Sequence, residues 1–208
     1  MKNALGIVGA SGHGKVIADI ARQVGYEQIY FFDDNKSVRS CGRYPVIGAT
    51  NQIIDHSCDI IIGIGNAAIR ERIQKKIEAS GGAMVTLIHP SAVIGEDVTL
   101  GAGSVVMAGA VINPGCKLGK GCIVNTCSSV DHDCILEDYV HIAIGAHVAG
   151  TVHIGNNTWV GAGATIINNI NICADCMIGA GAVVCKSIIE EGIYIGVPAK
   201  KYENINIF

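Results

Sequence analysis

The segment with the clearest capacity for acid–base chemistry surrounds a histidine that lies between two aspartates. Within residues 125–134, His132 is flanked by Asp131 and Asp133. A nearby carboxylate stabilises the imidazolium that forms when a histidine takes up a proton, so this arrangement suits a general base. Neighbouring residues of a flat strand point to opposite faces, so His132 and Asp133 could meet only at a corner of the chain. A surface histidine without a catalytic role is the open alternative.

A glycine-rich turn near the start of the chain could hold an anionic ligand. Residues 9–15 read GASGHGK and fall between a buried strand and a helical pattern. Such a turn offers backbone N–H groups and the positive end of a helix dipole to phosphate. Asp33 and Asp34 follow the next strand, where carboxylates can accept hydrogen bonds from a ribose or a base. The spacing is GxxGxG and not GxGxxG, so we expect no NAD site, and a tight structural turn is the alternative.

The nine cysteines could supply disulfides, zinc ligands or a nucleophile. Their odd number, and first residues that read as a buried strand and not as an export signal, favour free thiols in a reducing cytoplasm. Cys173 and Cys176 form a lone CxxC pair, without a second pair to complete a zinc site. Cys127 and Cys134 are close to His132 in sequence, but a thiol nucleophile needs a base directed at it. We therefore expect no covalent enzyme intermediate.

The elements that must position these residues are revealed by a repeat of six. Every sixth residue from Ile88 to Val184 is aliphatic, without a break in register. This period fits neither a helix nor a flat strand with long turns, but it fits a prism of three short parallel sheets, in which each hexad makes one side and one corner. Glycine often follows the aliphatic residue, and we interpret it as a residue with unusual backbone angles. The pattern resembles that of the hexapeptide-repeat acyltransferases, and this resemblance implies a left-handed parallel β-helix.

The same period decides how three histidines are placed. His141, His147 and His153 are spaced by six and therefore lie on three different sides of the predicted prism. One metal ion could not easily be coordinated by all three within one chain. This argues against the activity of the zinc carbonic anhydrases, which share the β-helix. We expect no metal.

The first part of the chain reads as a small α/β domain. Buried strands are expected over 5–8, 29–32 and 59–64, and helices over 16–24 and 67–80. Strands that alternate with helices imply a parallel sheet. Gly81 and Gly82 form a natural hinge. We therefore predict a Rossmann-like domain over 1–83 and a β-helix domain over 84–208.

Composition excludes several classes of partner. Half of the residues are apolar and 16% are charged, which suffices to bury a core. The net charge of −3 provides no basic surface for nucleic acid, so an anionic ligand must be held by local donors. Residues 139–174 carry no charged side chain, but polar residues recur every few positions, so we expect no membrane-spanning helix.

In order along the chain, these motifs resemble those of one family. They are GASGHG at Gly9, the pair Asp33-Asp34, IGN at Ile64, the hexad repeat, NTxSxVxHxC at Asn125, HIA at His141 and GVPAK at Gly196. Together they are similar, nearly from end to end, to the PglD/NeuD-type sugar acyltransferases. That family includes acetyltransferases of nucleotide-linked 4-amino-4,6-dideoxy sugars and O-acetyltransferases of sialic acid.

The resemblance implies a role for each candidate residue. His132 would be the general base, and Asp133, which stands where the nucleotide-amino-sugar enzymes carry Glu, would raise its basicity. His141 would contact the thioester region of acetyl-CoA, and Ala162 and Ala180 would meet the pantetheine arm through backbone groups. The nucleotide-sugar pocket would be lined by Ser11, Gly12, His13, Asp33, Asp34 and Gly65, while Asn125 would serve a corner or the sugar.

The leading interpretation is an acetyl-CoA-dependent N-acetyltransferase that acts on the amine of a UDP- or dTDP-linked 4-amino-4,6-dideoxy sugar for surface glycan synthesis. O-acetylation of sialic acid or another sugar is the alternative among enzymes, and a non-catalytic β-helix binding protein is the alternative of another class. A single convex prism has no deep cleft for two substrates. Because the resemblance also implies trimers, we expect a homotrimer with active sites between chains.

Overall fold

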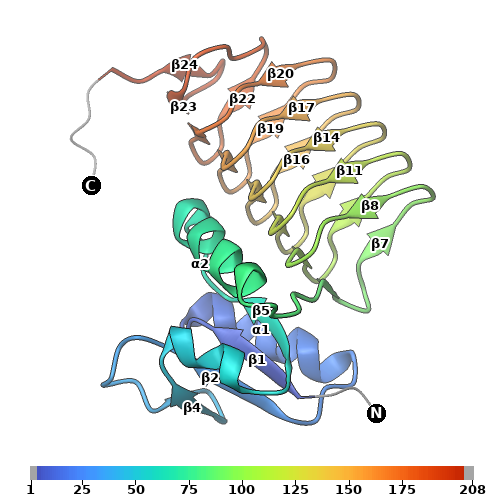
Figure 1. The fold of residues 1–208 in the computed structure, drawn as a ribbon. Coiled ribbons are helices and arrows are strands. Elements are labelled where there is room, and N and C mark those ends of the chain that lie inside the picture. Colours follow the sequence, from blue (N-terminus) through green and yellow to red (C-terminus); the bar gives the residue numbers. More distant parts are fainter. Residues whose placement is uncertain (1–3, 204–208) are drawn as a thin grey trace.

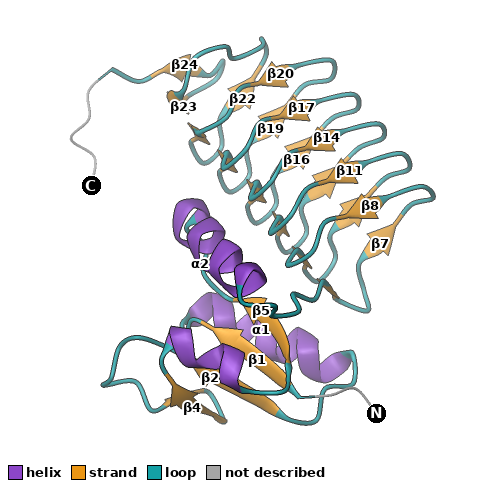
Figure 2. Cartoon of the chain, in the orientation of Figure 1, coloured by secondary structure: helices purple, strands orange, loops and turns teal. Residues whose placement is uncertain are grey.

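The computed structural model describes residues 4–203 and shows a small α/β domain followed by a parallel β-helix (Figures 1 and 2). The first domain has a sheet in the order β3-β4-β2-β1-β5. Its strands are β1 (Leu5–Val8), β2 (Ile29–Phe32), β3 (Ser40–Cys41), β4 (Tyr44–Gly48) and β5 (Asp59–Ile62). β1 is parallel to β2 and β5, as predicted for a parallel sheet, and β4, a strand that the sequence did not predict, is parallel to β2. The short edge strand β3 is antiparallel to β4 and departs from that prediction.

The first helix begins inside the glycine turn. α1 (Gly12–Gln23) starts earlier than the predicted residue 16, with Ser11 at its N-cap position. The reason is that Gly14 belongs to the helix and not to the loop. A side chain at Gly14 would collide with the carbonyl oxygen of Gly9 and lie 2.9 Å from the Phe31 ring. The glycine therefore lets α1 approach the end of β1 closely.

Helices cover both faces of this sheet. α1 packs on the face that includes Leu5 and Ile7. The 3-10 helix η1 (Thr50–Asp55) and α2 (Ala67–Ala79) cover the opposite face. Asn66 is the N-cap of α2, and its side chain accepts a hydrogen bond from Ile69 N at 3.0 Å.

The second domain winds through three sheets, here named sheets I, II and III. Sheet I contains β6 (Leu87–Ile88), β9 (Val105–Val106), β12 (Ile123–Val124), β15 (His141–Ile142), β18 (Trp159–Val160), β21 (Cys176–Ile178), β23 (Gly192–Ile195) and β24 (Lys200–Lys201). Sheet II contains β7 (Val93–Ile94), β10 (Val111–Ile112), β13 (Ser129–Val130), β16 (His147–Val148), β19 (Thr165–Ile166) and β22 (Val183–Val184). Sheet III contains β8 (Thr99–Leu100), β11 (Lys117–Leu118), β14 (Ile135–Leu136), β17 (His153–Ile154) and β20 (Asn171–Ile172). The strands of the three sheets are parallel, except that β24 pairs antiparallel with β23.

The aliphatic residue of each hexad points into the prism, as predicted. Val124, Val130 and Leu136, which follow one another around one coil, are buried in one continuous cluster. Each strand pairs with the strand one coil away, for example Ile123 with His141. The hexad repeat therefore fixes which side chains face outward on each sheet.

The glycine after the aliphatic residue has a different purpose from the predicted one. Gly101 and Gly161 do not have a positive φ; a side chain at Gly161 would instead lie 2.5 Å from the carbonyl oxygen of Ile178 in the next coil. These glycines are needed because neighbouring coils approach closely. The left-handed conformation lies two residues later, where Gly103 (φ 80°) and Asp133 (φ 57°) turn the corner. The prediction of unusual backbone angles at the first position was wrong.

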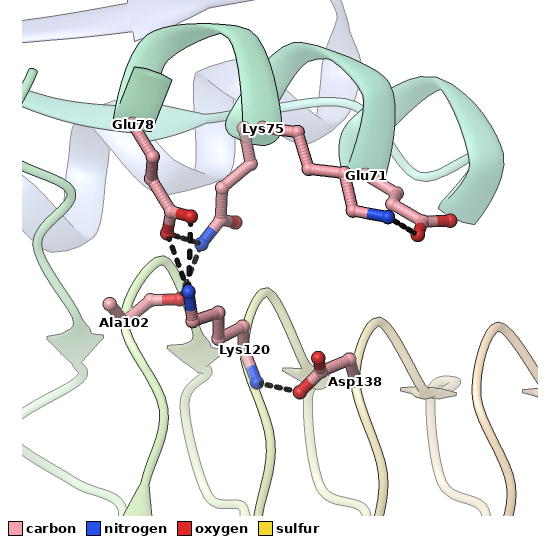
Figure 3. A network of polar contacts seen from close by, with 7 residues as sticks. Glu71, Lys75, Glu78, Ala102, Lys120 and Asp138 are labelled. Atoms are coloured by element: carbon pink, nitrogen blue, oxygen red, sulfur yellow. Dashed lines mark hydrogen bonds and ion pairs between the residues drawn. The ribbon is translucent and has the colours of Figure 1, made fainter. Parts of the chain in front are cut away.

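The two domains share an extensive interface. α2 lies beside the β-helix, along the corner between sheets III and I (Figure 1). In Figure 3, Lys120 of the β-helix forms an ion pair with Glu78 of α2 at 3.0 Å. Gln74, also on α2, donates a hydrogen bond to the carbonyl oxygen of Ala102 at 2.9 Å. The outward residues Val105 and Ile123 of sheet I belong to the same apolar cluster as α1. The first coils of sheet I are thereby an interdomain surface.

Candidate active site

His132 and Asp133 occupy the corner between sheets II and III, in the connection from β13 to β14. His132 Nδ1 lies 2.9 Å from Asp133 Oδ2, so the two side chains are hydrogen-bonded. Asp133 has the left-handed φ of the corner, which brings two neighbouring side chains to the same side. Asp131 supports the turn, because its Oδ1 accepts hydrogen bonds from His132 N at 2.8 Å and from Asn113 Nδ2 at 2.7 Å. The shorter aspartate therefore reaches the histidine.

The electrostatics of this corner suit a base. The hydrogen bond that His132 donates to Asp133 raises the pKa of His132, and the charge of Asp131 acts in the same direction. Since the carboxylate accepts from Nδ1, the lone pair of the neutral ring is on Nε2. The His132 side chain is 57% exposed, so Nε2 can meet a substrate. An exposed pair of this kind contributes little to stability.

His141 lies in a very different place, on β15 of sheet I beneath the first domain. It is only 7% exposed. Its Nε2 lies 3.2 Å from Asn125 Nδ2, and its ring stacks on Trp159 with centroids 5.5 Å apart and planes within 3°. A cavity of about 390 Å³ borders this wall, and Gly65 lines its other side. The structure therefore brings together three predicted site residues: His141, Asn125 and Gly65.

His13 from the glycine turn reaches the same region. Its ring centroid is 6.2 Å from that of His141. Burial lowers the pKa of His13 to about 4 and that of His141 to about 3, and the positive charge of Arg70 lowers both further. His13 Nε2 and His141 Nδ1 are buried and have no hydrogen-bond partner within residues 4–203. Two neutral histidines thus present polar atoms that a ligand could satisfy.

The two aspartates after β2 point to different places. Asp33 accepts hydrogen bonds from Ala10 N and Asn35 N, each at 2.8 Å, and so supports the glycine turn, on which Ser11 and Gly12 are exposed. Asp34 accepts from Thr50 N at 2.9 Å. It lines a separate cavity of about 680 Å³, together with Arg72 and Lys76 of α2. Of the residues predicted for one nucleotide-sugar pocket, Gly65 therefore lines the cavity beside His141 and Asp34 lines the other one.

Ala162 and Ala180 are exposed at the corner between sheets I and II. They lie on successive coils, since Gly181 N donates a hydrogen bond to Ala162 O at 2.9 Å. His132 is at the corner between sheets II and III, which is opposite sheet I in a three-sided prism. Within one chain, the structure therefore does not bring His132 together with His141 or with the two alanines.

Comparison with known proteins adds independent information. Residues 4–77 match the model of the PglD N-terminal domain, and residues 151–186 match the bacterial transferase hexapeptide (six repeats). The acetyltransferase domain of PglB from Neisseria gonorrhoeae FA1090, solved in complex with acetyl coenzyme A, is 39% identical with a TM-score of 0.94; the match covers 97% of this chain and 100% of that one. The chain belongs to the PglD-type sugar N-acetyltransferases with hexapeptide repeats.

Two curated relatives are consistent with this assignment. GDP-perosamine N-acetyltransferase of Escherichia coli O157:H7 is 29% identical over 173 residues, which is 79% of this chain and 78% of that protein. UDP-N-acetylbacillosamine N-acetyltransferase of Bacillus subtilis (strain 168) is 32% identical over 114 residues, 52% of each chain.

Sequence reasoning missed two residues that lie beside His141 in this candidate site. Arg70 is 1% exposed and binds carbonyl oxygens of both domains: Ile64 at 3.0 Å, Gly65 at 2.9 Å, Gly121 at 2.7 Å and Tyr139 at 2.7 Å. No signal marks it, because α2 carries several basic residues. Trp159 could have been found, since it follows His141 by one coil and must stack above it.

The remaining expectations concern the three evenly spaced histidines, the CxxC pair and membrane-spanning helices. His141, His147 and His153 lie on sheets I, II and III respectively, so the argument from their spacing is confirmed. Cys173 and Cys176 are free thiols with their sulfur atoms 3.5 Å apart. Within residues 4–203, no helix has the length and apolar character needed to cross a membrane.

Proposed function

We propose that this chain transfers the acetyl group of acetyl-CoA to the amine of a nucleotide-linked 4-amino-4,6-dideoxy sugar, as a step in surface glycan synthesis. The observation that carries the proposal is the His132–Asp133 pair, in which Nδ1 is hydrogen-bonded to the carboxylate and the histidine side chain is 57% exposed. Family membership supplies the reaction class, and the related N. gonorrhoeae domain was solved with acetyl coenzyme A. The curated relatives are named for GDP- and UDP-linked sugars, so the nucleotide is for experiment to decide.

The mechanism we propose is direct transfer. The sugar amine attacks the thioester carbonyl while His132 Nε2 takes its proton, and the bond to sulfur breaks as the tetrahedral intermediate collapses. The thiolate of CoA leaves and can recover that proton from the imidazolium. Asp133 stabilises the imidazolium between these two steps. No covalent enzyme intermediate is needed when both substrates are aligned in one site.

His141 would act without changing its charge. Its lowered pKa, about 3, keeps the ring neutral near pH 7, because burial disfavours the charged form. A neutral ring can donate one N–H, so we propose that His141 or nearby backbone N–H groups hold the developing oxyanion. Asn125, which contacts His141, would fix the orientation of that ring.

The glycine turn is proposed as the site of the nucleotide sugar. Ser11, Gly12 and His13 stand at the N-terminus of α1, where backbone N–H groups favour phosphate. The test is a thiol-release assay with acetyl-CoA and a panel of UDP-, GDP- and dTDP-linked 4-amino sugars, with free sialic acid as an additional acceptor. We expect turnover with one nucleotide amino sugar. Turnover of sialic acid alone would replace N-acetylation by O-acetylation.

We further propose that the active site is completed by a second copy of this chain in a homotrimer. His132 is on the corner opposite sheet I, whereas His141, Ala162 and Ala180 are on sheet I or its corner with sheet II. Three prisms packed side by side would create grooves walled by two chains each. Such a groove could place His132 of one copy opposite the proposed acetyl-CoA wall of the next.

Mixed oligomers test this arrangement. One parent carries His132→Ala and the other carries Ala180→Tyr, which blocks the proposed acetyl-CoA wall; each parent alone should be inactive. Refolded mixtures should regain part of the wild-type activity, because some interfaces would pair an intact base with an intact wall. A fully active monomer, shown by light scattering at the assay concentration, would contradict the proposal.

A further inference from the structure

The His132 ring lies directly over Gly150, which occupies the same corner in the next coil. A β-carbon built on Gly150 would be 2.5 Å from His132 Nε2, 2.7 Å from Cε1 and 3.0 Å from Cδ2. Real atoms do not approach this closely, so any side chain at this position would displace the ring. The nearest atom is Nε2, the nitrogen left available by the hydrogen bond from Nδ1 to Asp133.

The backbone itself does not require glycine at this position. Gly150 does not have a positive φ. The equivalent corner positions of neighbouring coils carry side chains: Glu96, Pro114, His132 and Asn168. A β-carbon is therefore compatible with this corner, and the absence of one at Gly150 matters for the ring above it.

Asp133, the other residue of the pair, also lies against a glycine of a neighbouring coil. A β-carbon on Gly115, one coil below, would lie 2.7 Å from Asp133 Oδ1. Gly115 also has φ 77°, which favours glycine for backbone reasons alone. At Gly115 the backbone conformation alone favours glycine, whereas at Gly150 the close contact is with the His132 ring only. A substitution at Gly150 therefore tests the effect on the histidine without straining the backbone.

We propose that Gly150 is a positioning residue for the general base, an inference that rests on the proposed function of His132. The pair is exposed, with side-chain exposures of 57% for His132 and 67% for Asp133, so one solvated hydrogen bond does not by itself hold the ring. The flat surface of Gly150 lets the ring lie across the corner with Nδ1 on Asp133 and Nε2 accessible. A methyl group there moves the ring off Asp133 and fills the space beside Nε2.

The first test is kinetic. Gly150→Ala should lower kcat by about 10- to 100-fold, because a base displaced by an ångström loses much of its effect. KM for acetyl-CoA should stay within twofold, since Gly150 is not part of the proposed acetyl-CoA wall. The matched control is Asn168→Ala, one coil further at the same corner, which should have wild-type kinetics. A kcat of Gly150→Ala within twofold of wild type would overturn the proposal.

The second test does not depend on turnover. The imidazole of His132 can be titrated by NMR in protein labelled at histidine, with its resonance assigned by its loss in His132→Ala. Its pKa, raised by Asp133 in the wild type, should move back toward the ordinary histidine value in Gly150→Ala and stay unchanged in Asn168→Ala. An unchanged His132 pKa in Gly150→Ala would overturn the role of Gly150 in orienting the ring, even if kcat fell.

These two readouts distinguish failure of this inference from failure of the proposed function. If the wild type turned over no sugar in the panel, the proposed function would fail, and the titration would still decide whether Gly150 seats the ring. Far-UV circular dichroism during thermal unfolding gives the remaining check. Loss of the folded state in Gly150→Ala alone would show that the corner needs glycine for its backbone, and would overturn the proposal.

Discussion

The corner that carries His132 and the interdomain pocket that carries His141 place the same side chain in opposite environments. The His132 side chain is 57% exposed and a carboxylate raises its pKa. His141 is 7% exposed, and burial together with Arg70 lowers its pKa to about 3. A group that must gain and lose a proton benefits from water and a counter-charge, whereas a group that must keep one protonation state benefits from burial beside a cation. The two environments therefore suit the different tasks that we propose for these histidines.

The largest effect is expected at the exposed corner. His132→Ala should lower kcat/KM by about 10²–10⁴-fold, the usual range for a general base. The free energy of unfolding should hardly change, since the side chain is exposed and makes no core contact. Steady-state kinetics with acetyl-CoA and thermal unfolding measure the two quantities.

The control is His147→Ala, another exposed histidine, on sheet II. Its kcat/KM should match the wild type within about twofold. Activity of His132→Ala within threefold of the wild type would remove this histidine from the mechanism and leave the exposed corner without a chemical role.

The next effect is expected at the pocket, where Arg70 joins the two domains. Arg70→Met removes hydrogen bonds to four backbone carbonyls, two in each domain. Buried acceptors left without donors should lower the free energy of unfolding by roughly 2–4 kcal/mol. KM for the sugar nucleotide should rise, because the Gly65 carbonyl loses the guanidinium that binds it, while the His132 pKa should not change.

Two variants sharpen this result. Arg70→Lys should recover little of the free energy of unfolding that Arg70→Met loses. The reason is that an ammonium group cannot bind carbonyl oxygens of both domains at once, as the planar guanidinium does. Arg72→Met, which removes an exposed cation from the same helix, should change stability by less than about 0.5 kcal/mol. If Arg70→Met and Arg72→Met lowered the free energy of unfolding equally, the positive charge of α2 would stabilise the protein and the interdomain hydrogen bonds of Arg70 would not.

The two regions also differ in how far the sequence predicts them. The hexad repeat predicts the prism. Because His132 and Asp133 are adjacent in the chain, the sequence also predicts that their side chains can meet only if they lie at a corner of that prism. The group around His141 combines His13 from the first turn of α1, Arg70 from α2 and His141 itself from β15. Nothing in their spacing relates these three residues, because their contact depends on how α2 packs along the β-helix. The separation of Asp33 from Asp34 is equally a product of packing.

Gly150 shows a second limit of sequence reasoning. The hexad pattern places a glycine one coil after His132, but glycines are frequent in this repeat for several reasons. Some prevent collisions between coils, and others have a positive φ. Only the contact with the His132 ring separates Gly150 from both groups. The sequence spacing therefore shows that Gly150 lies one coil after His132, and the structure shows that it contacts the His132 ring.

A smaller effect is expected from the partner of the base. Asp133→Asn removes the carboxylate that raises the His132 pKa. The free-enzyme base must be unprotonated, so kcat/KM rises with pH through the His132 pKa. In the variant, this rise should occur at lower pH than in the wild type, and the plateau should be lower because the base is weaker. A profile of kcat/KM from pH 5 to 9 measures both, and superimposable profiles would show that the pair does not function as a unit.

The smallest effect concerns the stability of the pocket in acid. The folded-state pKa values of His13 and His141, about 4 and about 3, lie below the ordinary value of 6.5. Between these values the unfolded chain binds more protons than the folded one, so the free energy of unfolding is highest above pH 6.5 and decreases as pH falls toward 4. His141→Gln keeps a polar, neutral side chain but removes one of these protonation sites.

The melting temperature of the wild type should therefore fall between pH 7 and pH 4.5, and that of His141→Gln should fall less, by a difference on the order of 2–4 °C. His147→Gln is the matched control, because its histidine is exposed on sheet II, and it should follow the wild type. Three parallel curves would mean that His141 accepts a proton in the folded state, and the contrast between a buried neutral histidine and an exposed basic one would no longer hold. A smaller slope for His141→Gln alone would locate the acid sensitivity in the interdomain pocket.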